Sequence, residues 1–231
     1  MVAPQRILDS DFNSVYSGHA RKYGYTSLGH FFETIGDALH ENPERKYVYA
    51  YYSEIDTLAH VYGTQSPQVT AQFAALDERF GRFLQAITGS DTALIVTADH
   101  GFIDAEPAQV IDLDTHPRLA ETLLLPLCGE RRVAYCYVHP EKTQQFESYV
   151  GTELADCATL FKSAQLIERG YFGLGSPHPR LLERVGHYTL IMKQNYTIKD
   201  WLLGERRHTQ IGVHGGVSEA EMGVPLIFLK K

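Results

Sequence analysis

The segment 91–101 constrains the fold more than any other part of the chain, because an apolar run leads directly into residues of metal-ligand type. The run is short and rich in β-branched side chains, which predicts a buried parallel strand. It continues through Thr97 and Ala98 into Asp99, His100 and Gly101. In open α/β sheets, ligands bind at the carboxyl ends of strands. A carboxylate, an imidazole and a residue without a Cβ at this point therefore predict a metal site.

Length and composition are those of an ordinary globular chain of 231 residues, long enough for one large domain or one domain with an elaboration. The formal charge of −7 makes a nucleic-acid-binding face unexpected. The three cysteines form no Cys-x-x-Cys pair, which predicts a reducing compartment and a cytoplasmic location. No apolar run approaches the ~18 residues that span a bilayer, so we expect no membrane partner.

The chain begins without an obvious sheet. Residues 1–27 are predicted to be irregular, with no opening strand. Residues 28–40 carry apolar side chains at helical spacing and predict a helix that ends before Asn42-Pro43. Residues 46–52 are rich in tyrosine and predict a strand.

A second pair of metal-ligand type follows that strand. If a helix starts near Ser53, Asp56 and His60 lie at i and i+4 on one helix face, where two side chains can hold one ion. Ser66 and Pro67 predict the start of a long helix that ends near residue 87. The order strand, pair, helix, strand, pair predicts a βαβ unit with both pairs at one sheet edge.

The rest of the chain is predicted to form a small α/β insertion or cap at residues 105–190, with strands near 132–138 and 186–192. The remaining segments, 1–104 and 191–231, are predicted to form the metal-binding core. Small residues crowd His214, which precedes Gly215 and Gly216, and allow a close approach of the backbone there. The apolar run 224–229 predicts a final strand, and its proline favours either the first residues of the strand or an edge position.

Each of these features also has an ordinary structural interpretation. Asp56 can be a helix-start residue, the Asp99-His100 pair can be a turn, and His214 can be a surface histidine. The adjacent Arg131 and Arg132 are expected to be a solvated pair. Taken together, five residues of metal-ligand type in three places favour a site. Asp and His without Cys suit zinc, manganese or another divalent ion, and two such ions suit phosphoryl or sulfuryl transfer.

The same residues resemble the alkaline phosphatase superfamily, and most closely its type I phosphodiesterase/nucleotide pyrophosphatase family. The resemblance rests on Asp56-x-x-x-His60 followed by Tyr62-Gly63, on the block 97–101, and on His214 with its two glycines. It covers roughly residues 1–104 and 195–231. It implies an α/β three-layer sandwich with two zinc ions at the carboxyl ends of the strands. By the family pattern, Asp56, His60 and His214 would hold one zinc, and Asp99 and His100 would be ligands of the other.

The resemblance also implies a mechanism that this sequence only partly matches. Members use a Thr or Ser nucleophile, which forms a covalent phospho-enzyme that a zinc-activated water hydrolyses. That nucleophile and one further Asp ligand lie at an early strand, which we do not find in this sequence. Thr26 and Ser27 precede a helix without a strand before it. We therefore expect the C-terminal part of the fold, incomplete at its N-terminal end.

Two functions of different classes follow. The first is a metal-dependent hydrolase of phosphodiester or pyrophosphate bonds, acting on a small phosphodiester or nucleotide, to which this chain gives most metal ligands but no nucleophile. The second is a catalytically inactive metal-binding module. Within the superfamily, a sulfatase or a phosphomutase is the alternative. An incomplete sheet would leave a strand edge exposed, which predicts self-association.

Overall fold

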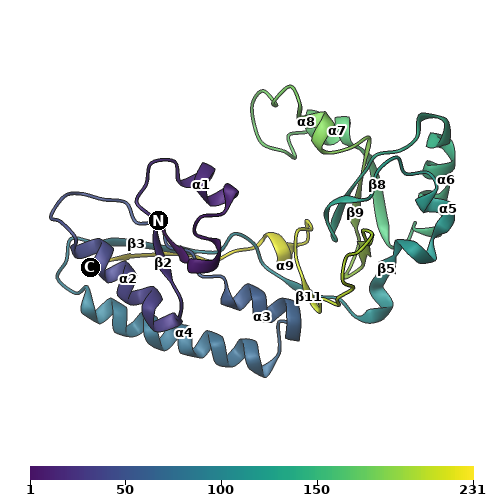
Figure 1. Ribbon diagram of the computed structural model, residues 1–231. Coiled ribbons are helices and arrows are strands. Elements are labelled where there is room, and N and C mark those ends of the chain that lie inside the picture. The colour runs from purple at the N-terminus through teal and green to yellow at the C-terminus, as the bar shows by residue number, and fades with distance from the viewer. The chain divides into compact units, whose positions relative to one another are not determined.

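The computed structural model describes all residues from 1 to 231 and is a mixed α/β structure (Figure 1). Contacts within the chain divide it into two compact units. The first comprises Met1–Thr97 and Leu226–Lys231, and the second comprises Ala98–Pro225. The predicted core and insertion have other boundaries, and that division stays a prediction. None of the helices has the length and apolar character that crossing a bilayer requires.

The first unit opens with a strand, so the expectation of an irregular start is wrong. Strand β1 (Val2–Pro4) pairs in parallel with β2 (Tyr23–Tyr25). Between them lie the short helices η1 (Gln5–Ile7) and α1 (Asp11–Ser17). Both strands have three residues, which is too short for an alternating pattern to appear in the sequence.

The predicted strand at residues 46–52 is reduced to one parallel bridge, between Val2 and Ala50. Two backbone hydrogen bonds accompany it: the Val2 N–H donates to the Tyr49 carbonyl at 2.8 Å, and the Tyr51 N–H donates to the Val2 carbonyl at 2.9 Å. The tyrosine-rich segment is therefore extended but has only a single pairing partner in the three-residue β1. Its side chains add to a small aromatic cluster around Val2, Tyr25 and Phe31.

Three helices of the first unit form where the sequence predicts them. Helix α2 (Leu28–His40) begins after Ser27, whose hydroxyl accepts the His30 N–H. Helix α3 (Glu54–Tyr62) carries the Asp-x-x-x-His pair. Helix α4 (Pro67–Ala86) has a proline in its first turn and begins after a capping serine. Capping residues satisfy backbone N–H groups that a helix start would leave without acceptors, which is why they mark these starts.

The organising strand β3 (Ala93–Thr97) forms as predicted, but its environment differs from the prediction. It pairs antiparallel with β12 (Leu226–Lys230) in a two-stranded sheet, so it is not part of a parallel βαβ arrangement. The Ile95 side chain is 68% exposed and that of Phe228 is 65% exposed. The β-branched composition indicates a strand, but it does not encode which distant segment pairs with it or in which direction.

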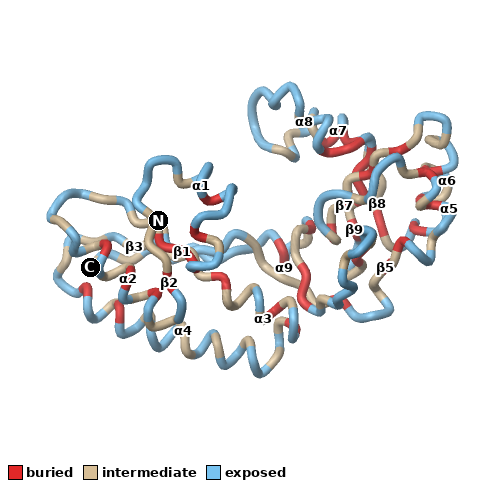
Figure 2. The backbone as a smooth tube through the Cα atoms, viewed as in Figure 1, coloured by how far each residue is buried: buried red, intermediate tan, exposed pale blue.

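The second unit is built on an antiparallel four-stranded sheet in the order β6-β7-β9-β8. Its strands are β6 (Cys128–Glu130), β7 (Val133–Cys136), β8 (Ala158–Lys162) and β9 (Tyr188–Met192). Helix α6 (Thr143–Glu153) contributes Phe146 and Val150 to the hydrophobic core beside this sheet. Buried residues are numerous in this part of the second unit (Figure 2).

Shorter elements complete the second unit. Strand β5 (Val110–Asp112) pairs in parallel with β10 (Thr197–Lys199), and β4 (Ile103–Asp104) pairs antiparallel with β11 (Gly212–Val213). The remaining helices are η2 (Pro107–Gln109), η3 (Leu113–Thr115), α5 (Pro117–Ala120), η4 (Pro140–Lys142), α7 (Ser163–Glu168), α8 (Leu181–Arg184) and α9 (Glu219–Met222). The β4–β11 pair matters most for the site, because His100 lies just before β4 and His214 just after β11.

Candidate metal centre

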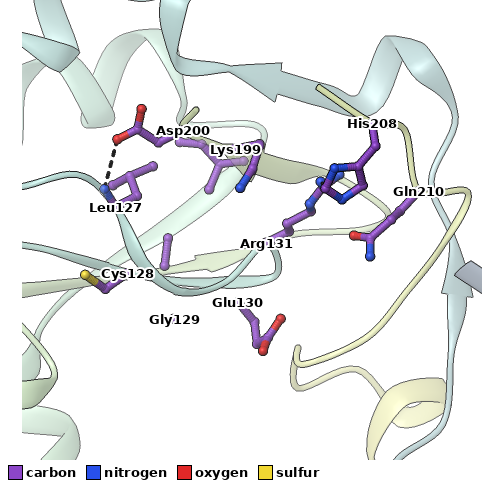
Figure 3. A pocket seen from close by; sticks show the side chains of 11 residues that line it. Leu127, Cys128, Gly129, Glu130, Arg131, Lys199, Asp200, His208 and Gln210 are labelled. Atoms are coloured by element: carbon purple, nitrogen blue, oxygen red, sulfur yellow. Dashed lines mark hydrogen bonds between the residues drawn. The ribbon is translucent and has the colours of Figure 1, made fainter. Parts of the chain in front are cut away.

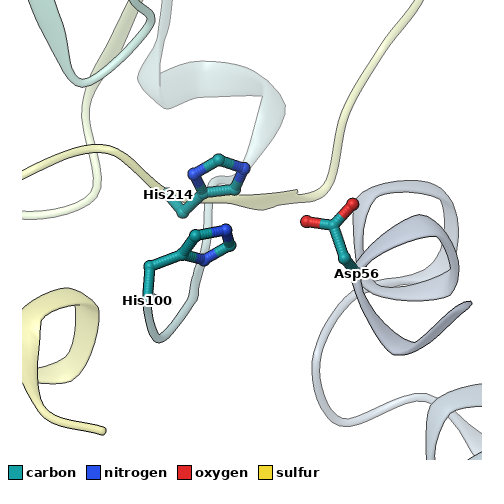
Figure 4. Close-up of side chains that lie close together, drawn as sticks. All are labelled: Asp56, His100 and His214. Carbon is teal, nitrogen blue, oxygen red and sulfur yellow. The ribbon is translucent and has the colours of Figure 1, made fainter. Parts of the chain in front are cut away.

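His100 and His214 lie with their rings stacked, as Figure 4 shows. The ring centroids are 3.7 Å apart and the ring planes differ by 13°. One ring nitrogen of each lies within 4.8 Å of one of the other. The antiparallel register Val213↔Ile103 explains the meeting, because it brings the chain after β11 alongside the chain before β4. Two predicted ligands far apart in sequence therefore meet.

Phe102 packs edge-on against both imidazoles. Its ring centroid is 5.2 Å from that of His100 and 5.1 Å from that of His214. The Nδ1 atom of His100 also lies 3.0 Å from the carbonyl oxygen of Gly101. These contacts limit how the His100 ring can turn, and the apolar ring beside the two histidines limits access of water from that side.

Gly101 is required by the close approach of helix α9. A Cβ atom at this position would lie 2.0 Å from the backbone oxygen of Ala220, which is far shorter than a van der Waals contact. The Gly101 N–H donates to the carbonyl of Glu221 at 2.7 Å. The glycine next to His100 therefore lets the histidine loop bind directly to the backbone of α9.

The loop that carries His214 is hydrogen-bonded to the side chain of Glu221, whose backbone carbonyl binds the Gly101 N–H. The Gly216 N–H donates to Oε1 of Glu221 at 2.8 Å, and the Ser218 hydroxyl donates to Oε2 at 2.7 Å. Ser218 and Glu221 have the spacing of a capping box, but no capping box forms. The serine makes no side-chain cap and instead donates to the carboxylate.

Arg132 completes the arrangement around Glu221, and its predicted solvation is wrong. Its Nε donates to Oε1 at 3.0 Å and one terminal nitrogen donates to Oε2 at 3.0 Å, while the other donates to the Tyr196 carbonyl. Both side chains are 1% exposed. The buried charge is tolerated because each of the three guanidinium nitrogens donates a hydrogen bond to an oxygen acceptor.

The electrostatics favour an ionised Glu221. Burial by itself would raise the pKa of its carboxyl, but hydrogen bonds from Arg132, Ser218 and Gly216 outweigh that effect, so the pKa lies below its ordinary value. The sequence gives no signal that pairs these two residues, because neither lies in a recognisable motif with the other. These are the supporting residues that sequence reasoning missed.

The other predicted ligands are placed as follows. The Asp99 side chain is largely exposed, and its Oδ1 lies 3.8 Å from Nε2 of His100. In the first unit, Asp56 and His60 lie on α3, with Oδ1 and Nε2 3.4 Å apart (Asp56 is drawn in Figure 4). The predicted i, i+4 spacing is therefore confirmed. Each unit thus contains one group of candidate ligands, two in the first and three in the second.

This donor set fits zinc. Imidazole nitrogens and carboxylate oxygens are ordinary zinc ligands, and a site with these donors needs no cysteine. In metal centres, neighbouring backbone and carboxylate groups fix the orientation of the ligands. Here, the backbone and the carboxylate of Glu221 hold the loops that carry His100 and His214.

A separate polar pocket of about 250 Å³ lies in the second unit (Figure 3). Strands β6 and β10 line it, together with Arg131, Asp200 and His208, and none of the predicted ligands is among its lining residues. The Asp200 carboxylate accepts the Leu127 N–H at 3.0 Å. Burial lowers the pKa of the Arg131 guanidinium, although Glu205 and Glu130 act in the opposite direction.

The chain is similar in sequence to one established family. The pattern that defines type I phosphodiesterase / nucleotide pyrophosphatase proteins matches residues 2–216. No curated protein sequence matches the chain.

Solved structures give a consistent picture of the fold. The chain is similar to human ectonucleotide pyrophosphatase / phosphodiesterase 5, with 18% identity, a TM-score of 0.69, and coverage of 98% of this chain and 59% of that one. The murine protein of the same name has 19% identity and a TM-score of 0.65, covering 89% and 54%.

A bacterial structure is also similar. Phosphonoacetate hydrolase from Sinorhizobium meliloti 1021, in complex with phosphonoformate, has 19% identity and a TM-score of 0.60, covering 94% of this chain and 54% of that one. The chain thus spans less than two thirds of each of these structures. Together these likenesses confirm the predicted fold class, an α/β fold of the alkaline-phosphatase type.

Proposed function

This chain belongs to the type I phosphodiesterase/nucleotide pyrophosphatase family, and from that membership we propose that it supplies the metal-binding part of a hydrolase of phosphodiester or pyrophosphate bonds. The observation that carries the proposal is the stacked His100–His214 pair with Asp99 beside it. Both histidines are partly buried, and hydrogen bonds from Gly101 and Gly216 to Glu221 fix the loops that carry them. A pair of imidazoles held in this way is an arrangement that suits metal binding.

We propose the same ligand assignment that the family resemblance implies. Asp56, His60 and His214 hold one zinc ion, and Asp99 and His100 are ligands of a second. The stacking of His100 on His214 supports this, because ligands of two neighbouring ions must themselves be neighbours. The 3.4 Å separation within the Asp56–His60 pair supports it as well, because both side chains can reach one ion.

Two bound ions would polarise a phosphate ester and generate a nucleophile from water near neutral pH. The residues of this chain would then have three tasks. The carboxylates of Asp56 and Asp99 supply negative charge that offsets the ions, the imidazoles fix their positions, and Phe102 shields one side of the histidines from water. The substrate we propose is a small phosphodiester or a nucleotide.

We also propose that the attacking nucleophile is not contributed by these residues. Thr26 and Ser27 directly follow β2, so the expectation that no strand precedes them is wrong, and both are engaged at the start of α2. Ser27 accepts the His30 N–H at 3.2 Å, and the Thr26 hydroxyl lies 3.4 Å from Nδ1 of His30. A metal-binding module without hydrolase activity is therefore the second candidate, favoured for this polypeptide alone. A sulfatase or phosphomutase relative stays the alternative within the superfamily.

The test combines zinc binding with hydrolysis of bis(p-nitrophenyl) phosphate. Zinc affinity is measured by competition with a chelating dye for the wild-type chain, His214→Ala and Asp99→Ala. Exposed His178, which is not a predicted ligand, gives the matched control His178→Ala. We expect a loss of affinity of about tenfold or more in the two ligand variants and none in the control.

The outcomes separate the candidates. Hydrolysis that is lost in Asp99→Ala supports the hydrolase. Zinc binding without hydrolysis supports the metal-binding module. Equal zinc affinity in all four proteins would overturn the ligand assignment.

A further inference from the structure

We infer that Glu221 is a positioning residue that holds the His100 and His214 loops in one arrangement. The role is to fix the positions of the two loops relative to each other, and its significance for metal binding rests on the proposed function. Glu221 lies in α9, seven residues after His214, and it is not among the residues that carry the family resemblance. Unlike a residue that only fills the core, it makes hydrogen bonds to both histidine loops.

One residue binds both histidine loops, each through a different group. Its backbone carbonyl accepts the N–H of Gly101, the residue directly after His100, at 2.7 Å. Its carboxylate accepts the N–H of Gly216, two residues after His214, at 2.8 Å. A shift of Glu221 therefore moves both loops together, and the stacking of the two rings depends on their relative position.

Both glycines are adapted to this contact. A Cβ atom on Gly216 would lie 2.5 Å from Oε2 of Glu221, and one on Gly101 would meet the backbone oxygen of Ala220. The loops therefore come as close to α9 as the backbone allows. At such distances the hydrogen bonds tolerate little displacement of either loop.

The carboxylate itself is immobilised by four hydrogen bonds, two on each oxygen. Oε1 accepts from Arg132 and Gly216, and Oε2 accepts from Arg132 and Ser218. Arg132 lies between β6 and β7 and also donates to the Tyr196 carbonyl, so it connects the carboxylate to the four-stranded sheet. The chain of contacts runs from the sheet through Arg132 and Glu221 to the histidine loops.

The experiment separates positioning from a general contribution to folding with two double variants. Both remove the buried charges together, so that neither leaves an unpaired ion. Arg132→Met/Glu221→Gln keeps a side-chain oxygen that can accept the Gly216 N–H. Arg132→Met/Glu221→Leu removes that acceptor while keeping an apolar filling.

Zinc affinity and cobalt absorption are measured on both variants. We expect Arg132→Met/Glu221→Leu to lose about 10- to 100-fold in zinc affinity, the range for groups that orient metal ligands. Arg132→Met/Glu221→Gln should stay within about threefold of the wild type, because the glutamine oxygen keeps an acceptor for the Gly216 N–H. The visible absorption of bound Co²⁺, which reports coordination geometry, should change only in the leucine variant.

A second readout needs no metal. Hydrogen exchange of the Gly101 and Gly216 amides, followed by NMR in the metal-free chain, should be faster in the leucine variant and close to wild type in the glutamine variant. If the wild-type chain binds no zinc, the proposed function fails, and this exchange measurement alone decides the role of Glu221.

The matched control destabilises the same unit elsewhere. Ser163 and Thr189 are buried, and their hydroxyl oxygens lie 2.9 Å apart, with no contact to the histidine loops. Ser163→Ala/Thr189→Val should therefore lower stability without changing zinc affinity or Gly216 exchange. The inference is overturned if the leucine and glutamine variants match in zinc affinity, cobalt spectrum and amide exchange.

Discussion

Arg132 and Glu221 form a buried ion pair, joined by two hydrogen bonds of 3.0 Å, between residues 89 positions apart in the sequence. Buried ion pairs often contribute little net stability, because removing two charges from water costs nearly as much as their attraction returns. This pair has a further consequence, because its carboxylate also accepts the N–H of Gly216. It therefore links the four-stranded sheet to the loop that carries His214.

Removing one partner of this pair should be costly. Arg132→Met leaves the Glu221 carboxylate buried without its cation, and we expect the free energy of unfolding to fall by about 3–5 kcal/mol. Urea unfolding followed by circular dichroism measures the change. The exposed pair Arg180–Glu183 gives the control: Arg180→Met should cost about 1 kcal/mol or less. Equal effects of the two substitutions would contradict the account.

Acid should remove the contribution of Glu221. Its pKa is lower in the folded chain than the ordinary value of about 4.3, so the folded state holds the carboxylate ionised more strongly than the unfolded state does. The contribution to stability is complete above the unfolded pKa and is lost as the pH falls through the folded pKa. Urea unfolding of wild type and Arg132→Met/Glu221→Leu between pH 7 and pH 3 measures this. As the pH falls below the unfolded value of about 4.3, the wild type should lose stability relative to the double variant, and parallel curves would count against this account.

Gly101 should not tolerate a side chain. In Gly101→Ala the new Cβ meets the backbone oxygen of Ala220, so α9 must move, and we expect a loss of about 1–3 kcal/mol together with weaker zinc binding. Gly151 lies inside α6, where nothing lies within 4 Å of an added Cβ. Gly151→Ala should be neutral or stabilise by up to about 1 kcal/mol. Thermal unfolding and the dye competition together distinguish the two variants.

The exposed β3–β12 sheet should promote self-association. Ile95 and Phe228 are apolar and largely exposed on a two-stranded sheet. Such a surface with unpaired strand edges favours contact with a second copy. Sedimentation velocity across a concentration series should show dimers or larger species, and Ile95→Lys should shift the chain toward the monomer. A wild-type chain that stays monomeric at high concentration would remove the basis for this prediction.

Local features of the fold were predictable because their causes are local. The starts of α2 and α4 follow from the capping residues Ser27 and Ser66, and the position of β3 follows from its β-branched run. The spacing of Asp56 and His60 on one face of α3 also follows from the sequence, since only helical geometry is needed to derive it.

The features that the sequence did not reveal depend on distant partners. The antiparallel pairing of β3 with β12 joins the last strand of the chain to one in its first half, and no residue of either strand encodes that choice. Strand β1 is stabilised by Tyr23–Tyr25 and by one bridge to Ala50, which three residues of sequence cannot indicate. Arg132 and Glu221 gave no signal for the same reason. The five candidate ligands were identifiable by residue type, but their binding of metal and the cytoplasmic location stay predictions.

The place of Glu221 near the end of the second unit also bears on the order of events during synthesis. The ribosome releases His100 and Arg132 well before it releases the residue that orders both histidine loops. Until Glu221 emerges, the Gly101 and Gly216 amides lack the acceptors that they have in the finished fold. A nascent chain would therefore be able to complete its four-stranded sheet before the two histidine loops can take the arrangement that they have in the finished fold.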